Sequence, residues 1–126
     1  MERVMSRFGG VFYAAMRVVL AFIYMAHGLQ KLFGMFGGHA VPLNSLFGVA
    51  GILETVLGAL IALGLFTSWA AFIAAGEMAT AYFMAHAPRG RLPIQNGGEL
   101  AVVLCFAFLY IASQGGGRFS ADAVRR

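Results

Sequence analysis

Charged residues are scarce in this sequence. They make up 11% of its 126 residues, while 60% of the residues are hydrophobic; an ordinary soluble domain has about 25% charged residues. So little polar surface excludes a soluble enzyme, a disordered tail and a nucleic-acid-binding protein. The net charge of +4 does not change this, because the cations are spread along the chain and form no basic stripe for a nucleic acid.

Cysteine is almost absent as well. The single Cys105 excludes an intramolecular disulfide, a CxxC redox pair and a metal site built from several cysteines. No two histidines or carboxylates lie four residues apart in one expected helix, so we expect no bound metal. A haem held between His27 and His86 is disfavoured, because helical spacing turns His86 away from the polar face of its helix.

Proline is confined to the gaps between four apolar segments, which cover residues 11–30, 46–66, 69–87 and 98–114. A helix of about 20 apolar residues crosses the roughly 30 Å hydrocarbon layer of a membrane, and a proline inside it would break or kink it. We therefore predict an all-α fold, with residues 1–126 forming one integral membrane four-helix bundle with a polar interior.

The cations outside these segments predict the orientation of the bundle. The side with both termini carries Arg3, Arg7, Arg118, Arg125 and Arg126, and the other side carries Lys31, Arg89 and Arg91. We expect both termini in the cytoplasm. Arg17 interrupts the first segment and no small-x-small cleavage site follows it, so we expect this segment to be retained and not removed as a signal peptide.

Each expected helix brings an ionisable side chain onto one face when residues advance by about 100°. Arg17 and Glu77 lie at a similar depth on the side of the termini, which predicts a buried ion pair. Such a pair is either functional or only fixes the register of the helices.

In the opposite half of the bundle, the same spacing predicts a polar cluster. A carboxylate deep in a membrane costs a few kcal/mol or more unless it is paired, neutral or hydrated, which makes Glu54 a candidate for a ligand or proton site. A purely structural role stays open for these residues. The candidate cavity opens away from the termini and is lined by His27, Lys31, Glu54, Glu99 and Phe106.

Several sequence pieces occur in a characteristic order and spacing. They are Arg17, HGLQKLFG at 27–34, GILETVLGALIALGLF at 51–66, NGGELA at 96–101 and GGGRFSAD at 115–122. Together they resemble the DoxX family of small four-helix bacterial membrane proteins. The resemblance implies an inner-membrane location, and some relatives are described as subunits of a thiosulfate:quinone oxidoreductase, others as linked to oxidative-stress complexes. The matching positions are Arg17, His27, Lys31, Glu54, Glu99 and, in the tail, Arg118 and Asp122; Glu77 rests on the helix-face argument alone.

The residues and the resemblance leave two hypotheses for the function, which belong to different classes. The first is an accessory subunit of a redox system, in which Lys31 or His27 would hydrogen-bond a quinone carbonyl and Glu54 would transfer a proton. The second is a non-catalytic assembly partner or a carrier of small solutes. The chain has no dinucleotide fingerprint and no nucleophile constellation, which favours an accessory role over an independent enzyme. The expected partners are the lipid bilayer and subunits of redox enzymes, and association with further copies of the chain is left open.

Overall fold

The structure, a computed structural model, describes residues 1–125; Arg126, which contributes to the orientation argument, lies outside the described residues. The four apolar segments form long helices: α2 Gly9–Phe33, α3 Leu46–Leu63, α4 Thr67–Ala81 and α6 Glu99–Gln114. Shorter helical elements are α1 Glu2–Met5, η1 Ser6–Phe8, η2 Tyr82–His86, η3 Ala87–Arg89, α5 Pro93–Asn96 and α7 Ala121–Arg125. No strand occurs in the described part of the chain. The all-α fold class is therefore confirmed.

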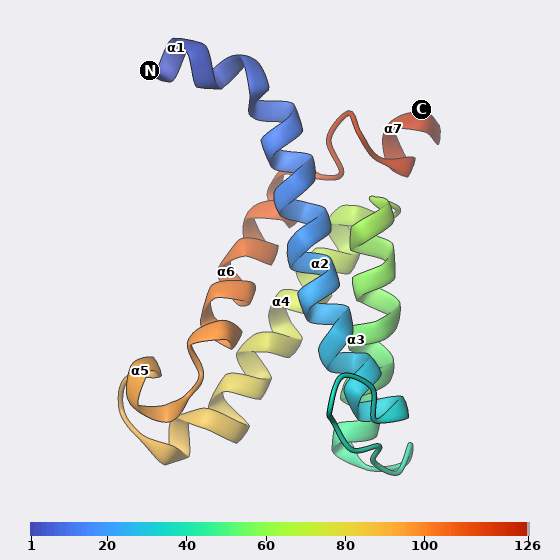
Figure 1. Ribbon diagram of the computed structural model, residues 1–126, viewed down its shortest axis with the longest axis vertical. Coiled ribbons are helices and arrows are strands. Elements are labelled where there is room, and N and C mark those ends of the chain that lie inside the picture. Colours follow the sequence, from blue (N-terminus) through green and yellow to red (C-terminus); the bar gives the residue numbers. More distant parts are fainter. Residues whose placement is uncertain (126) are drawn as a thin grey trace.

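The long helices form two hairpins. Helix α2 packs along α3, α4 packs along α6, and α3 and α4 join the hairpins. Figure 1 shows that the hairpins diverge with distance from the end where both termini and the α3–α4 turn lie. We call this end the terminal end. The opposite end, with the 34–45 loop and α5, is the loop end.

Alanines line the inner face of α4, and several large apolar side chains of the bundle point outward. The buried face of α4 is formed by Ala70, Ala71, Ala74, Ala75 and Met78. By contrast, Phe22, Phe72, Phe83 and Phe106 are exposed by half or more of their surface. Two helical stretches, Glu2–Phe33 and Leu46–Leu63, are long and apolar enough to cross a membrane, and α6 is a shorter apolar helix.

Glycine allows α2 and α3 to approach closely. A Cβ atom added to Gly28 would lie 2.6 Å from the Thr55 hydroxyl oxygen and 2.8 Å from the Gly51 carbonyl oxygen. Added to Gly51, it would lie 2.9 Å from the Cβ atom of Lys31. Small residues at such positions let helix backbones pack against each other. This contact sets the distance between the Lys31 backbone and the polar face of α3.

Local signals fix the ends of the long helices. Gly34 and Gly64 end α2 and α3 in the left-handed conformation, with φ of 69° and 72°, which favours glycine. The Ser45 hydroxyl accepts the Gly48 amide hydrogen at 3.1 Å and begins α3. Helix α4 follows α3 almost directly, so the two run antiparallel.

Candidate functional site

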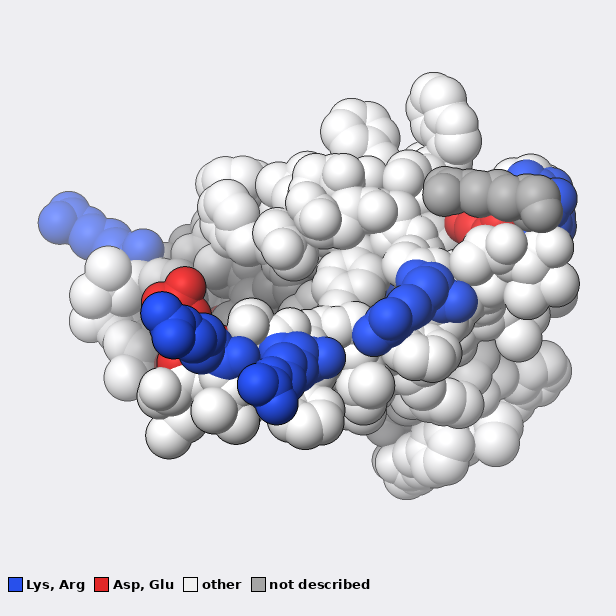
Figure 2. Space-filling model, turned by 90° about the horizontal axis from the view of Figure 1, so that it is seen from above, with Lys and Arg blue, Asp and Glu red and all other residues white. Residues whose placement is uncertain are grey.

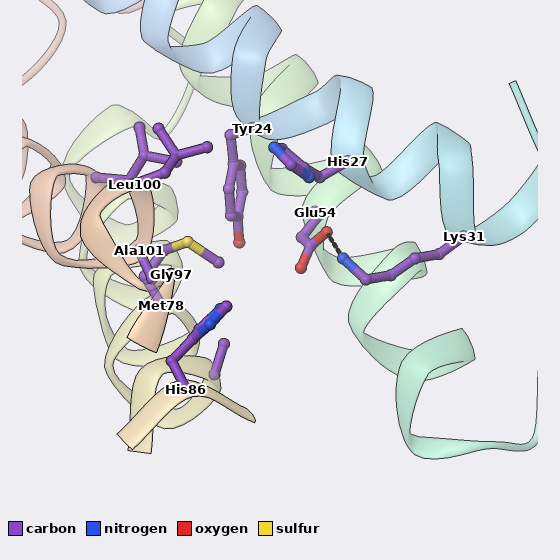
Figure 3. A pocket seen from close by; sticks show the side chains of 11 residues that line it. Tyr24, His27, Lys31, Glu54, Met78, His86, Gly97, Leu100 and Ala101 are labelled. Carbon is purple, nitrogen blue, oxygen red and sulfur yellow. Dashed lines mark hydrogen bonds and ion pairs between the residues drawn. The ribbon is translucent and has the colours of Figure 1, made fainter. Parts of the chain in front are cut away.

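A cavity of about 180 Å³ lies between the two hairpins near the loop end. The first hairpin contributes Tyr24, His27, Lys31 and Glu54, and the second contributes Met78, Ala81, His86, Gly97, Leu100, Ala101 and Leu104. Figure 3 shows the polar groups of both hairpins facing one another across this space. Of the side chains expected to line it, His27, Lys31 and Glu54 do so.

Lys31 and Glu54 form an ion pair at the wall of the cavity. The Lys31 Nζ and Glu54 Oε1 atoms are 2.6 Å apart, and Glu54 is 1% exposed. Lys31 lies in the last turn of α2, where the close contact at Gly51 holds its stem against α3. Because removing a carboxylate from water costs several kcal/mol, this pair explains how Glu54 is accommodated in an otherwise apolar helix.

A second polar contact crosses from one hairpin to the other. The Tyr24 hydroxyl donates to Glu77 Oε1 at 2.9 Å. The Tyr24 ring is fully buried and meets Phe108 of α6 edge to face, with ring centroids 5.0 Å apart. Tyr24 thus links α2 to α4 through Glu77, which is partly exposed.

His86 lines the cavity, contrary to the expectation that it points away. The cause is the element η2, a π-helical turn in which the Ala87 amide donates to the Tyr82 carbonyl oxygen, five residues back. Such a turn contains one more residue than an α-helical turn and rotates everything beyond it. A helical projection that advances every residue by 100° does not include this rotation, and the sequence carries no plain signal for the π-helical turn.

Asn96 holds this region in place and was missed from the sequence. It is 3% exposed, donates through Nδ2 to the Tyr82 hydroxyl at 3.0 Å, and accepts the Gly98 amide hydrogen at 2.8 Å. The His86 Nδ1 atom lies 3.4 Å from the Asn96 carbonyl oxygen. The NGGELA piece, which begins at Asn96, could have pointed to it.

Glu99 and Phe106 do not line the cavity, which corrects the expected α6 face. Glu99 is exposed in the first turn of α6, and Phe106 is 67% exposed on the outer surface. The inward face consists of Ala101, Leu104, Phe108 and Ile111. The expected inner face of α6 assumed that Glu99 lies in the interior. A carboxylate in the first turn of a helix needs no interior partner, because the helix dipole and water already stabilise it.

Arg17 and Glu77 do not form the expected ion pair. The Arg17 Nε donates to the Ile61 carbonyl oxygen at 3.0 Å, and the other guanidinium nitrogens donate to the carbonyl oxygens of Ala62, Gly116 and Phe119. The depth estimate failed because it used backbone positions, whereas the long arginine side chain extends toward the terminal end. There it binds carbonyl groups at the end of α3 and in the C-terminal segment, and the Ile61 carbonyl oxygen also accepts the Gly64 amide hydrogen.

The tail positions also have a structural role. Asp122 accepts the backbone hydrogens of Phe66 and Thr67, each at 2.9 Å, and thereby caps α4. Burial raises the pKa of Asp122, but the hydrogen bonds from Thr67 and Phe66 and the charge of Arg125 lower it, and the net pKa is below its usual value. Arg118 is exposed, and its guanidinium carbon lies 5.1 Å from the centre of the Phe119 ring.

Groups of three or more His, Cys, Asp or Glu side chains suited to a metal ion do not occur among residues 1–125. The nitrogen atoms at the cavity, from His27, Lys31 and His86, are instead arranged to meet a ligand oxygen or to exchange a proton. The opposite wall, with Leu100, Ala101 and Leu104, is apolar. The cavity can thus take a small ligand that has one polar edge and one apolar face.

Comparison with known proteins agrees with the sequence pieces described above. The DoxX family model matches residues 12–87, which include most of α2, all of α3 and α4, and η2. A protein of Haemophilus influenzae, described as an uncharacterized protein, is 40% identical over 125 residues, which cover 94% of this chain and 93% of that protein. No solved structure matches. The chain belongs to the DoxX family.

Proposed function

We propose that all four long helices cross the bacterial inner membrane, with both termini in the cytoplasm. The large apolar side chains on the outside of the bundle support this, because lipid accepts them and water does not. Figure 2 shows the terminal end, where blue basic side chains outnumber red acidic ones. The exposed cations Arg3, Arg7, Arg118 and Arg125 belong to this end, as the positive-inside rule requires of a cytoplasmic face.

We further propose that the cavity binds the head group of a quinone, and that the protein is an accessory subunit of a membrane redox system. One observation carries the proposal: Glu54, almost fully buried, is held by Lys31 at the wall of a cavity between two hairpins. An ionisable group placed inside a membrane and beside a cavity is a functional candidate by default. A cluster with a purely structural role would not need the cavity.

Different residues of the cavity have different roles in the proposed reaction. Lys31 or His27 donates a hydrogen bond to a quinone carbonyl oxygen, and Leu100 and Leu104 cover the ring. Phe106 plays no part in this wall, because it faces outward. Reduction of a quinone to a quinol takes up two electrons and two protons. A partner redox enzyme supplies both electrons, and Glu54 passes on both protons one after the other, taking each from water that enters the cavity. This chain therefore binds and protonates, and the partner reduces.

The size of the cavity restricts the ligand. Its volume of about 180 Å³ is below the roughly 300–1,000 Å³ of pockets that enclose a drug-sized molecule. A single ring therefore fits inside, and a long isoprenoid tail must leave the cavity.

A binding experiment with a matched control tests this function. The protein in lipid nanodiscs is titrated with a radiolabelled short-chain benzoquinone, together with Glu54→Gln and Glu99→Gln. We expect Glu54→Gln to weaken binding about tenfold or more, which corresponds to about 1.4 kcal/mol, at a nearly unchanged melting temperature. Glu99 is an exposed carboxylate outside the cavity, so Glu99→Gln should bind the quinone as tightly as the unaltered protein does. Failure of the unaltered protein to retain quinone, or equal binding by Glu54→Gln, would contradict the proposal.

Mass spectrometry of proteins that co-purify in mild detergent tests the accessory role. Stoichiometric recovery of a redox enzyme is the expected result. Recovery of the chain alone, or only with subunits that have no redox cofactor, would favour an assembly partner or solute carrier.

A further inference from the structure

The two walls of the cavity differ in how many polar side chains they carry. The first hairpin contributes Tyr24, His27, Lys31 and Glu54, whereas His86 is the one polar side chain among the described lining residues of the second hairpin. Figure 3 shows the His86 ring pointing into the cavity, toward Glu54 and Lys31. A ligand that spans the cavity and is bound at Lys31 therefore meets His86 with its opposite polar edge.

The segment that contacts the His86 ring is held firmly in place. The Asn96 Nδ2 atom donates to the Tyr82 hydroxyl at 3.0 Å and to the Gly90 carbonyl oxygen at 3.2 Å, and Asn96 Oδ1 accepts the Gly98 amide hydrogen at 2.8 Å. Both donor hydrogens and the oxygen of this buried amide are thus used. Gly98 packs directly on His86, because a Cβ atom added to Gly98 would lie 2.8 Å from the His86 Cβ atom.

The backbone of Asn96 determines which nitrogen of His86 carries the hydrogen. The His86 Nδ1 atom lies 3.4 Å from the Asn96 carbonyl oxygen. A carbonyl oxygen only accepts hydrogen bonds, so Nδ1 is the donor, and in a neutral imidazole the other nitrogen, Nε2, then has a free lone pair. The second wall therefore offers the ligand a hydrogen-bond acceptor, while the Lys31 ammonium on the first wall has only donor hydrogens.

An acceptor opposite a donor suits a quinol better than a quinone. Both oxygens of a quinone are carbonyl oxygens, so the oxygen next to His86 Nε2 would face a second acceptor with no hydrogen between them. A quinol has a hydroxyl group at each edge. One hydroxyl hydrogen can be donated to His86 Nε2 while the oxygen of the other hydroxyl accepts from Lys31.

We propose that His86 accepts the hydrogen of a quinol hydroxyl, so that the cavity binds the reduced ligand more tightly than the oxidised one. The inference rests on the proposed quinone site and names the redox form that this site favours. Tighter binding of the quinol makes reduction of the bound quinone by the partner's two electrons more favourable. A tenfold preference raises the two-electron potential of the bound couple by about 30 mV.

Two probes of similar shape that differ in one hydrogen-bond donor test this proposal. 4-Methoxyphenol has a hydroxyl donor opposite an ether oxygen, and 1,4-dimethoxybenzene has two ether oxygens and no donor. Ligand-observed NMR measures the affinity of each for the protein in nanodiscs, for His86→Leu and for the control His39→Leu, whose histidine is exposed and outside the cavity. We expect a preference for 4-methoxyphenol that falls about fivefold to tenfold in His86→Leu and is unchanged in His39→Leu.

A second measurement keeps His86 in place and needs no ligand. In the double variant His27→Leu/His39→Leu, His86 is the only remaining histidine, and nitrogen-15 NMR should show its hydrogen on Nδ1. A hydrogen on Nε2 would overturn the proposal. An equal preference in the unaltered protein and in His86→Leu, or no binding of 4-methoxyphenol to the unaltered protein, would overturn it as well.

The short-chain benzoquinone is titrated into the same samples, which separates this inference from the proposed function. Retention of quinone with no effect of His86→Leu on the probe preference contradicts the role of His86 and leaves the quinone site standing. A probe preference that depends on His86, without retention of quinone, supports the role of His86 and contradicts the proposed ligand.

Discussion

Asp122 joins the C-terminal segment to Thr67 at the start of α4. Its carboxylate accepts the Thr67 backbone amide hydrogen at 2.9 Å and the Thr67 hydroxyl hydrogen at 2.7 Å. The Asp122 amide in turn donates to the Gly64 carbonyl oxygen at 2.8 Å, at the end of α3. Residues 115–125 are thus part of the bundle and hold the α3–α4 turn.

Removal of this cap should destabilise the protein. We expect Asp122→Ala to lower the free energy of unfolding by about 1–2 kcal/mol, as the loss of a helix N-cap does, and Asp122→Asn to have a smaller effect. Thermal unfolding in detergent at pH 7 measures both. Glu2→Ala, which removes an exposed carboxylate of α1, is the control. An unchanged melting temperature for Asp122→Ala would show that the tail contributes nothing to stability.

The contribution of Asp122 should depend on pH. Its pKa in the folded protein is lower than its ordinary value, so its stabilisation is fully present above the unfolded pKa of about 3.9. It is lost as pH falls through the lower, folded pKa. The difference in melting temperature between the unaltered protein and Asp122→Ala should therefore be constant from pH 7 to 5 and shrink below about pH 4. A difference that grows on acidification would contradict this.

Arg17 and Glu77 should behave as independent residues. Arg17→Leu removes the side-chain donor that binds the Ala62, Gly116 and Phe119 carbonyl oxygens, and should lower the free energy of unfolding by about 1–3 kcal/mol. Glu77 has a different hydrogen-bond partner, Tyr24. The effects of Arg17→Leu and Glu77→Leu on unfolding free energy should therefore add within about 0.5 kcal/mol in the double variant. A double variant more stable than either single variant would indicate an ion pair after all.

Two glycines provide a matched test of the helix packing. Gly28→Ala places a methyl group against Thr55 and should destabilise the protein by about 1–3 kcal/mol. Gly76 has nothing within 4 Å of an added Cβ atom, so Gly76→Ala should be neutral or stabilising by up to about 1 kcal/mol. Melting temperatures in detergent compare the two. Equal effects would mean that α2 and α3 do not approach as closely as described.

The cavity should be accessible from one side of the membrane. In a Cys105→Ala background, Ala81→Cys and Leu100→Cys place a thiol at the cavity, and Gly9→Cys places one at the terminal end. In oriented vesicles, a membrane-impermeant maleimide should label the first two variants from the side of the loop end. It should label Gly9→Cys from the other side. Equal labelling of Ala81→Cys from both sides would show a continuous channel.

The helices could be predicted from the sequence, because length, hydropathy and proline placement all act locally. The proximity of Lys31 and Glu54 could also be predicted from the sequence. Both residues lie at a similar depth in the bundle, on helix faces that carry small residues. The hydrogen-bond partners of Arg17 could not be predicted, because they are backbone carbonyl groups, which every residue has. The inner face of α6 was predicted wrongly. Glu99 lies at the end of the helix, where a charged residue does not indicate which face points inward.

The π-helical turn at 82–86 makes the composition of the cavity depend on chain length as well as on residue type. Deletion of one residue from this turn would restore ordinary α-helical pitch, and residues beyond it would swing by about 100° around the axis. His86 would then leave the cavity while every side chain of the chain's first hairpin stayed in place. Homologous chains that differ by a single insertion or deletion here would therefore present different ligand-binding groups from an otherwise identical bundle. An alignment that ignores the gap would equate residues that point in different directions around the helix.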